Sequence, residues 1–371
     1  MSFAYQEIAE SVAAVAASHA AEVDRGNFPS DALRALADQG LLGLVSAAEV
    51  GGKGESLAAA AHVVERIARE CGSTAMVLTM HYCATAVIEK LGAKDVRQAI
   101  AAGKHVSTLA FSEPSSRSMF WVSTNTATAA GGNVRISGKK SFVTSARHAD
   151  SYVWSTKPTA GSALSTLWLV PRATTGVRIG AAFDGLGLRG NDSSPVTAED
   201  AQLPASARLG NDGDGFDQMI GVVLPWFDVL SAAVSCGLME AAVERTAKHA
   251  GATRFEHAGS SIAELPTARA FVAKMRIRTD QSKLLNADTI AAIAGARPDA
   301  TLRVLETKAA AGEAATEVTD LAMRVCGGAA FRKDLAVERV FRDARAALVM
   351  APTTDALYDF LGKAVCGLPV F

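Results

Sequence analysis

Two hydroxyl-bearing residues, Ser112 and Thr144, adjoin short segments in which apolar and polar residues alternate. Alternation at a period of two, bounded by Gly, Pro, Asn and Ser, predicts strands of a half-buried antiparallel sheet. The expected strands are residues 122–130, 134–143 and 152–155, and the expected turns are residues 113–116, 131–133 and 138–140. Polar groups at strand ends can face a ligand without the cost of a buried, unpaired hydroxyl. The sequence therefore predicts that Ser112 and Thr144 lie at a ligand-facing edge of a sheet.

Helical patterns flank this sheet on both sides. Apolar residues recur at helical spacing near the N-terminus, as at Ile8, Val12 and Val15. The expected longer helices cover residues 55–71 and 73–91 before the sheet, and 218–251, 265–295, 298–324 and 352–365 after it. We therefore expect an α+β, multi-domain protein. Its parts are an N-terminal helical domain (1–104), a central antiparallel β-domain (105–210) and a C-terminal helical bundle (211–371).

The composition excludes several classes of protein. The chain has 371 residues, enough for two or three packed units with sizeable cores. No run of eighteen apolar residues and no signal-peptide pattern occurs, so neither a membrane span nor secretion is expected. A net charge of −1 gives no electrostatic case for nucleic acid. Five scattered cysteines without a C-x-x-C pair predict neither disulfides nor a metal site, and we expect a cytoplasmic protein.

Two segments of the sheet carry a family resemblance. FSEPSSRS (111–118) and ISGKKSFVTSARHAD (136–150) resemble the two flavin-facing segments of the acyl-CoA dehydrogenase family. Ser112 falls on the family's flavin-side threonine, Glu113-Pro114 match, and Ser118 falls on the serine that faces substrate and flavin. Further matches are Gly138, Lys140, Phe142, Val143, Thr144, Ala146, Ala149 and Asp150. Because two such segments occur in the family's order, the resemblance covers the fold as well as the motif.

The resemblance implies FAD as the cofactor and hydride transfer to its ring. Donors aimed at the ring stabilise the charge that builds up on the reduced flavin. In the family's arrangement Thr144 would serve the ring nitrogen that accepts the hydride, and Ser112 with the backbone around Phe111 would serve the pyrimidine edge. Phe142, next to Val143, would pack against the ring. Taken singly these are ordinary strand-end hydroxyls and a core aromatic, but the set favours a flavin site.

A second group of cofactor residues is implied in the C-terminal half. CGGAAFRKDLAVERVFRDARA (326–346) resembles a family segment whose paired glycines approach the FAD of a neighbouring subunit, and a Cβ would block that approach. Gly327 and Gly328 match these glycines. Arg254 is the candidate partner of the FAD diphosphate, because a guanidinium fork suits a diphosphate. The same resemblance assigns Arg324, Thr353 and Asp355 to the cofactor site. A site shared in this way implies a homodimer or homotetramer.

The family's catalytic base is missing from its usual position. Members of the family commonly abstract the substrate α-proton with a glutamate, but counting from Arg345 places Ala351 there, and a methyl group accepts no proton. Removing a general base costs about two to four orders of magnitude in rate. Some relatives carry an alternative base upstream, at a position that falls here on or beside Phe227. Asp228 is the next residue, and the rings of Trp226 and Phe227 would raise its pKa. The sequence favours the alternative, in which Asp228 is a structural acid in the first turn after Pro225 that complements the helix dipole.

These observations predict a flavin-dependent oxidoreductase. The simplest activity is α,β-dehydrogenation of an acyl thioester with a non-standard base, for which Asp228 is the candidate. Two alternatives stay open: a flavin monooxygenase on the same fold, which needs no α-proton base, and a catalytically silent paralogue that binds FAD or acyl-CoA. The expected partners are acyl-CoA or a related small molecule, and an electron-transfer protein.

Overall fold

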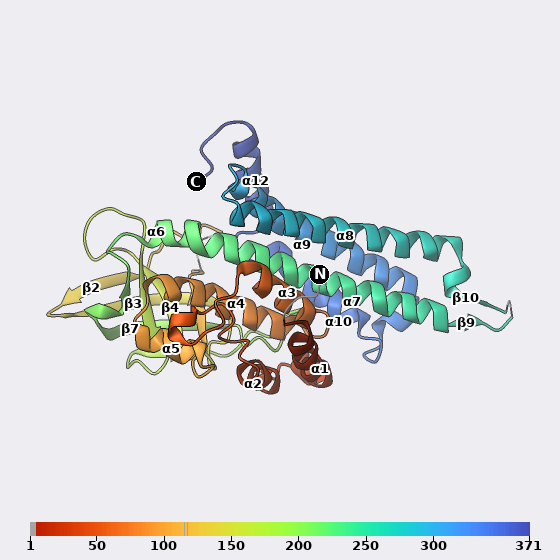
Figure 1. Ribbon diagram of the computed structural model, residues 1–371, viewed down its shortest axis with the longest axis horizontal. Coiled ribbons are helices and arrows are strands. Elements are labelled where there is room, and N and C mark those ends of the chain that lie inside the picture. Colours follow the sequence, from red (N-terminus) through yellow and green to blue (C-terminus); the bar gives the residue numbers. More distant parts are fainter. Residues whose placement is uncertain (1–4, 115, 117, 258) are drawn as a thin grey trace.

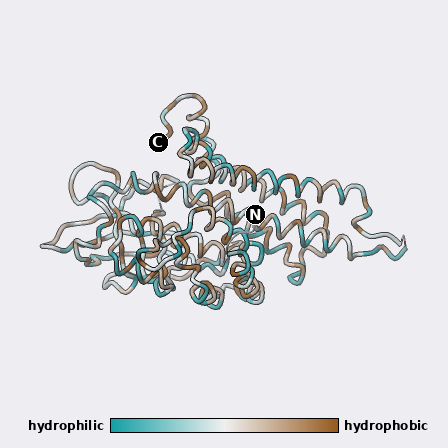
Figure 2. Tube along the Cα trace, in the orientation of Figure 1, coloured by the Kyte–Doolittle hydropathy of each residue, from teal (hydrophilic) through white to brown (hydrophobic). Residues whose placement is uncertain are grey.

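The computed structural model describes residues 5–114, 116, 118–257 and 259–371. The molecule is elongated, with the sheets gathered at one end, long helices along its length and a small hairpin at the other end (Figure 1). Apolar and polar positions alternate along the long helices, as expected for helices with one buried face (Figure 2).

The chain begins with short helices that surround a central one. Their bounds are α1 Gln6–Val23, α2 Ser30–Asp38, η1 Ala48–Val50, α3 Leu57–Ala68, α4 Gly72–Leu91 and α5 Lys94–Ala101. Helix α4 is buried over most of its residues, because it packs against α3, α7 and strand β1. The two longer helices expected over 55–71 and 73–91 correspond to α3 and α4.

The β-domain contains two four-stranded sheets within the described residues. Its strands are β1 Ser107–Ala110, β2 Thr126–Ala130, β3 Asn133–Val143, β4 Ser151–Thr156, β5 Thr166–Pro171, β6 Val177–Ile179, β7 Ser194–Pro204 and β8 Arg208–Leu209, with a 3₁₀ turn, η2, at Ala205–Ala207. The strand orders are β1-β4-β5-β8 and β2-β3-β7-β6. The pairing is antiparallel as expected, except that β1 runs parallel to β4. The strand predicted over 134–143 matches β3 closely.

The turn expected at residues 138–140 is wrong, because these residues continue strand β3. A register shift between Ile136 and Gly138 bends the strand without ending it. A Cβ added at Gly138 would lie 2.1 Å from the side chain of Asn125. The glycine therefore marks a close approach of two chain segments, which is its other common role in a strand.

Long helices form the C-terminal part. They begin with α6 Gly215–Gln218, the π-helical turn η3 Met219–Val223 and α7 Leu224–Ala252, and continue with β9 Arg254–Phe255, β10 Ser260–Ser261, η4 Ile262–Glu264, α8 Pro266–Ala294, α9 Ala300–Cys326, η5 Gly327–Phe331, α10 Val337–Ala344, α11 Ala346–Val349 and α12 Thr354–Val365. The sequence patterns had not indicated α10 and α11 as separate helices.

The first of these helices is continuous from Gly215 to Ala252. Pro225 lacks an N–H and would clash with the carbonyl four residues earlier in a regular α-helix, so the wider π turn just before it lets the helix continue. By length and composition this helix could cross a membrane, with a mean hydropathy of 1.8 in its most apolar window, but 72% of that window is buried inside the protein. It therefore has the surroundings of a core helix.

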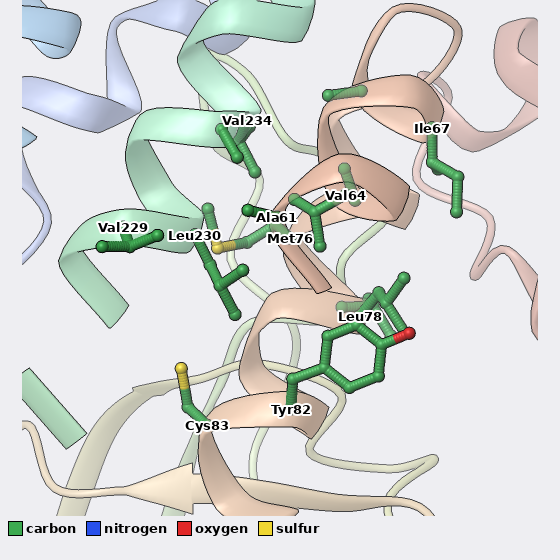
Figure 3. Packing of buried hydrophobic residues seen from close by; sticks show 14 of the residues in the cluster. Ala61, Val64, Ile67, Met76, Leu78, Tyr82, Cys83, Val229, Leu230 and Val234 are labelled. Carbon is green, nitrogen blue, oxygen red and sulfur yellow. The ribbon is translucent and has the colours of Figure 1, made fainter. Parts of the chain in front are cut away.

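Two large hydrophobic cores and a small cluster of Ala250, Ala268 and Val325 lie within the described residues. The larger core joins the N-terminal helices to α7 and α9, so that these parts fold against each other. Figure 3 shows one section of it, in which Ala61 and Val64 of α3 and Met76 of α4 face Leu230 and Val234 of α7. The second core lies in the β-domain; among its largest side chains are Tyr152, Trp154 and Trp168.

Candidate functional site

A buried ion pair joins the two segments that carry Ser112 and Thr144. The Lys140 ammonium donates to Glu113 Oε1 at 2.7 Å, with 0% and 1% of the two side chains exposed. Lys140 also approaches the carbonyl of Phe111 at 3.5 Å. One residue further on, the Ser141 N–H donates to the carbonyl of Ser112 at 2.8 Å. These contacts place the two segments side by side.

Both partners of this ion pair are well provided with hydrogen bonds. Glu113 also accepts from the hydroxyl of Ser123 at 2.6 Å and from the N–H of Thr124 at 2.8 Å, and Lys140 also donates to Ser155 Oγ at 2.7 Å. Burial lowers the pKa of Lys140 to about 8, although the charge of Glu113 opposes this shift. Burial alone would raise the pKa of Glu113, but the charge of Lys140 and the hydrogen-bond donors outweigh it, so that pKa lies below its usual value.

The predicted flavin-facing side chains differ in how they are exposed. Phe142 is 64% exposed, in a positive-φ conformation (φ 53°), with its ring 4.5 Å from that of Phe183. Thr144 is buried, and its hydroxyl has no hydrogen-bond partner among the described residues. The side chains of Phe111 and Val143 lie in the two hydrophobic cores, so only their main chains can face a ligand. Phe142 is therefore not a core aromatic, and its ring is free to stack on a planar group.

Ser118 connects the β-domain to the C-terminal helices. Its hydroxyl donates to Thr353 Oγ1 at 3.2 Å and accepts from the Thr353 N–H at 3.1 Å. Ser118 has φ 74°, a strained conformation for a residue other than glycine. Thr353 is also the N-cap of α12, accepting from the Ala356 N–H at 3.4 Å, and Asp355 is exposed in the first turn of that helix. Two residues assigned to the site from segments 235 positions apart thus touch each other.

Two arginines of the second predicted group, Arg254 and Arg324, lie at the opposite end of the molecule from the β-domain. Arg254 is in the β9–β10 hairpin, which Figure 1 shows far from the β-domain, and it donates to the carbonyl of Gly259 at 3.3 Å. Arg324, in the last turn of α9, has its guanidinium 4.5 Å from the ring centroid of Phe271. The 29 residues of α7 that lead from the β-domain side to Arg254 span about 43 Å. One chain therefore does not bring Arg254 and Arg324 to the flavin-facing segments of the β-domain.

The paired glycines have open space above them. A Cβ added at Gly327 or at Gly328 would meet no atom of the protein within 4 Å, and Gly327 has φ 55° and ψ −137°, which only glycine adopts readily. This open backbone, together with the exposed ring of Phe142 and the unpartnered hydroxyl of Thr144, fits a large planar cofactor with a charged tail. The fit requires that the two ends come from different copies of the chain.

Asp228 is fully buried in α7. Its exposure is 0%, and both carboxylate oxygens lack a hydrogen-bond partner among the described residues. Burial raises its pKa to about 8, opposed by the positive charge of Lys308. The expectation that Asp228 complements a helix dipole is wrong, because the helix continues for thirteen residues before it, from Gly215. The raised pKa agrees with the other interpretation, but no carboxylate atom reaches a surface.

Three models of one protein family match the chain. They are the N-terminal domain (residues 4–103), the middle domain (108–201) and the C-terminal domain (213–366) of acyl-CoA dehydrogenases. The chain belongs to the acyl-CoA dehydrogenase family. Members of this family are flavin-dependent oxidoreductases, and the three matched domains correspond to the helical, β and helical parts of the fold.

Relatives and solved structures agree with this assignment. Short-chain specific acyl-CoA dehydrogenase of Bos taurus mitochondria is 28% identical over 352 residues, covering 91% of this chain and 82% of the relative. Butyryl-CoA dehydrogenase of Megasphaera elsdenii has the same fold, with a TM-score of 0.89, 20% identity and coverage of 99% and 100%. The complex of PigA with FAD and proline is similarly close, with a TM-score of 0.89, 20% identity and coverage of 99% and 98%.

The sequence did not single out Lys308. Its ammonium, 1% exposed, donates to the carbonyls of Met350 at 3.0 Å and Pro352 at 2.6 Å, on either side of Ala351. In the sequence Lys308 is one of several charged residues of α9, so no local pattern set it apart. The ion pair of Glu113 and Lys140 was also missed, although both residues belong to the matched motif.

Proposed function

We propose that the protein is a FAD-dependent oxidoreductase that dehydrogenates an acyl thioester between its α and β carbons. The observation that carries this proposal is the joining of the two flavin-facing segments by Glu113 and Lys140, with Phe142 exposed beside them. In such a reaction the substrate loses a proton from the α carbon and a hydride from the β carbon. The names of the curated relatives, such as short-chain acyl-CoA dehydrogenase, support this class of substrate.

Bound FAD would supply the hydride acceptor. The Thr144 hydroxyl is available to donate to the ring, Ser112 and the main chain at Phe111 lie on the neighbouring segment, and the Phe142 ring can cover an edge of the flavin. The Ser118–Thr353 contact would fix the boundary between β-domain and bundle, where the acyl group must enter. Gly327, Gly328, Arg254 and Arg324 of a second copy would hold the charged tail, with Thr353 and Asp355 near the ring end.

The proton acceptor is the open step of this proposal. Ala351 cannot accept a proton, and Asp228 has the basicity but lies wholly inside the bundle. For Asp228 to act as the base, its side chain must turn toward the acyl group when substrate binds. Asp228→Asn would then slow flavin reduction by about two orders of magnitude or more, because the acceptor would be lost.

One anaerobic experiment tests the proposed reaction. The purified, FAD-loaded protein is mixed with a panel of saturated acyl-CoA thioesters, and the flavin absorbance is followed without oxygen. We expect at least one thioester to bleach the flavin and yield the α,β-unsaturated product. An FAD-loaded protein that no thioester bleaches would overturn the dehydrogenase proposal.

The missing base favours a second candidate, a flavin monooxygenase on the same fold. Oxygen and reduced flavin carry out that chemistry, so no group has to take an α-proton, in keeping with Ala351 and with the burial of Asp228. Oxygen consumption by the chemically reduced protein, coupled to hydroxylation of an added substrate, would support this candidate. A protein that binds FAD yet shows neither activity would be the silent paralogue.

The proposed site also requires self-association. The outer face of α8 carries Ile277 and Leu284, which are 57% and 71% exposed, at a spacing of seven residues. Alanines 270, 273, 287 and 291 are exposed on the same helix. A second copy packed on this face would bury these side chains and bring the far glycines toward a β-domain. Mass measurement by light scattering should give a dimer or tetramer, and a monomer that retains one FAD per chain would contradict the shared site. An electron-transfer protein as the oxidant remains part of the proposal.

A further inference from the structure

A single ammonium group holds the turn that contains Ala351. Lys308 extends from α9 and donates to the carbonyls of Met350 and Pro352, so it bonds to both sides of the residue that replaces the family's base. Immediately after this turn, Thr353 is fixed to Ser118 by two hydrogen bonds. The chain between α11 and α12 is thus anchored to the bundle by one residue and to the β-domain by the next.

Asp228 is the acid whose charge acts on the pKa of this ammonium. The two groups act on each other electrostatically, although no ion pair within 4 Å joins them. The charge of Lys308 opposes the rise in the pKa of Asp228, and the charge of Asp228 opposes the fall in the pKa of Lys308. The groups that face Asp228 come from two other helices: Lys308 on α9 and the buried thiol of Cys83 on α4, whose own pKa the charge of Asp228 helps to raise. The Phe227 ring lies 5.8 Å from the Lys308 ammonium.

The chemistry of the two groups suits two different roles, one as a hydrogen-bond donor to the turn and the other as a compensating acid. A buried ammonium needs acceptors, and Lys308 has two carbonyls. It also needs a compensating negative group, and the nearest acid in this part of α7 is Asp228, which has no other partner among the described residues. A carboxyl group without hydrogen bonds and without access to a surface is poorly placed to take a proton from a substrate, but once ionised its charge acts on Lys308 through an apolar medium.

We propose that Lys308 and Asp228 are positioning residues, in which Lys308 holds the Met350–Pro352 turn in place for the acyl thioester and Asp228 acts only through the charge of Lys308. This proposal rests on the proposed function for the identity of the ligand. It differs from the relocated-base interpretation, in which Asp228 contacts the substrate and works independently of Lys308.

A double-mutant cycle distinguishes the two roles. The variants are Lys308→Met, Asp228→Asn and the double variant, all FAD-loaded, and the probe is acetoacetyl-CoA, a thioester already oxidised at its β carbon. Binding is measured by calorimetry, so no turnover is needed. We expect Lys308→Met to weaken probe binding by about tenfold, because two charge-assisted hydrogen bonds are lost, while FAD affinity stays unchanged. Lys308→Arg, which keeps the charge and the donors, should recover part of the loss.

The decisive comparison is the effect of Asp228→Asn in two backgrounds. If Asp228 acts through Lys308, the substitution, measured at pH 8 where Asp228 is partly ionised, weakens binding alone but adds less than about twofold once Lys308 is Met. An equal effect in both backgrounds would overturn the proposal. Lys283→Met is the matched control, because Lys283 is a bundle lysine that pairs with Glu65 and Glu240 at 2.7 and 3.0 Å, remote from this turn. It should leave probe binding unchanged.

Hydrogen exchange gives a second readout that needs no thioester. The Thr353 N–H, bonded to Ser118 Oγ, should exchange at least tenfold faster in Lys308→Met than in wild type, whereas amides of strand β7 should not change. Equal Thr353 protection in both proteins would overturn the proposal. If Lys308→Met does not fold, Lys308→Arg and Asp228→Asn are compared by the same exchange. Wild type that does not bind the probe but shows the exchange effect would count against the thioester, and not against the positioning role.

Discussion

Lys140 in the β-domain and Lys308 in the bundle are both 1% exposed, and burial lowers the pKa of each to about 8, yet their surroundings differ. Lys140 has a carboxylate at 2.7 Å that is itself satisfied by several donors. Lys308 has two carbonyls, and its acid, Asp228, has no hydrogen bond among the described residues. Lys140 holds two segments of the β-domain together through a fully hydrogen-bonded ion pair. Lys308 holds a turn, while the carboxyl group of Asp228 has no hydrogen bond among the described residues.

The difference indicates where the molecule is built for stability and where for function. A buried pair with all its hydrogen bonds made is structurally self-sufficient. A buried acid without partners is a cost that a folded protein normally avoids, so its presence within electrostatic reach of Lys308 points to a role beyond stability.

The largest expected effect comes from breaking the complete pair. Lys140→Met leaves the Glu113 carboxylate buried with its ammonium removed, which should lower the free energy of unfolding by about 3–5 kcal/mol. Urea denaturation measures the loss, and Lys139→Met, at the exposed neighbouring position, is the control. The double variant Glu113→Gln/Lys140→Met should regain part of the stability. If Lys140→Met lowers the free energy of unfolding by less than about 1 kcal/mol, the ion pair does not hold the two segments together.

The two acids should respond to pH in opposite directions. The pKa of Asp228 is raised from 3.8 to about 8, so between these values the folded state binds more protons than the unfolded state, and stability falls as pH rises. The pKa of Glu113 is lowered below 4.5, so its contribution is present above pH 4.5 and is lost as pH falls below it. Relative to wild type, Asp228→Asn should therefore gain stability from pH 5 to pH 8, at most about 1.4 kcal/mol per unit.

Denaturation curves at pH 3, 5, 6.5 and 8 test this contrast, with Glu113→Gln as the matched variant. Glu113→Gln should approach wild-type stability only in the acid range, where wild type has lost its ion pair. A constant difference between wild type and Asp228→Asn over pH 5–8 would mean that the carboxyl group keeps one protonation state there.

A smaller effect is expected at the contact between β-domain and bundle. Ser118→Ala removes both hydrogen bonds to Thr353 while the strained backbone stays, which should cost about 1–2 kcal/mol of unfolding free energy. Ser18→Ala, at an exposed site on α1, is the control and should change stability by less than about 0.5 kcal/mol. Equal losses in the two variants would show that the bridge contributes nothing to stability.

Much of the fold followed from periodicity, and the shortfalls have physical reasons. The helices α3, α4, α8 and α9 and the strand β3 were predicted within a few residues, because the period of their apolar residues and the Gly and Pro that bound it are visible in the sequence. The parallel pairing of β1 with β4 left no such period, since it depends on segments about forty residues apart. The π turn before Pro225 was also unreadable, because proline ordinarily indicates a helix start.

The site was predictable where a motif carries it and not where distant contacts do. Ser112, Ser118, Phe142 and Thr144 stand in two contiguous segments, and whether they hold the flavin is still a prediction. The role of Lys308 depends on its hydrogen bonds to carbonyls more than forty residues later in the chain, and no local sequence pattern encodes such contacts. For Asp228 the sequence indicated a shifted pKa correctly, but its complete burial arises from the packing of α4, α7 and α9 and could not be read locally.

The smallest effect on stability should accompany a clear effect on the flavin. Thr144→Val keeps the volume, and because the hydroxyl has no partner among the described residues, its loss should change the unfolding free energy of the apoprotein by less than about 0.5 kcal/mol. If the hydroxyl donates to the bound ring, removing it destabilises the reduced form by about 1 kcal/mol, which is about 20 mV toward a more negative two-electron potential. Spectroelectrochemistry of the FAD-loaded protein measures the shift. The neighbouring Ser145, whose buried hydroxyl is likewise unpartnered among the described residues, supplies the control, since Ser145→Ala should leave the potential unchanged. Identical potentials in Thr144→Val and wild type would remove Thr144 from the site and leave Ser112 and the main chain at Phe111 as the proposed donors of the β-domain.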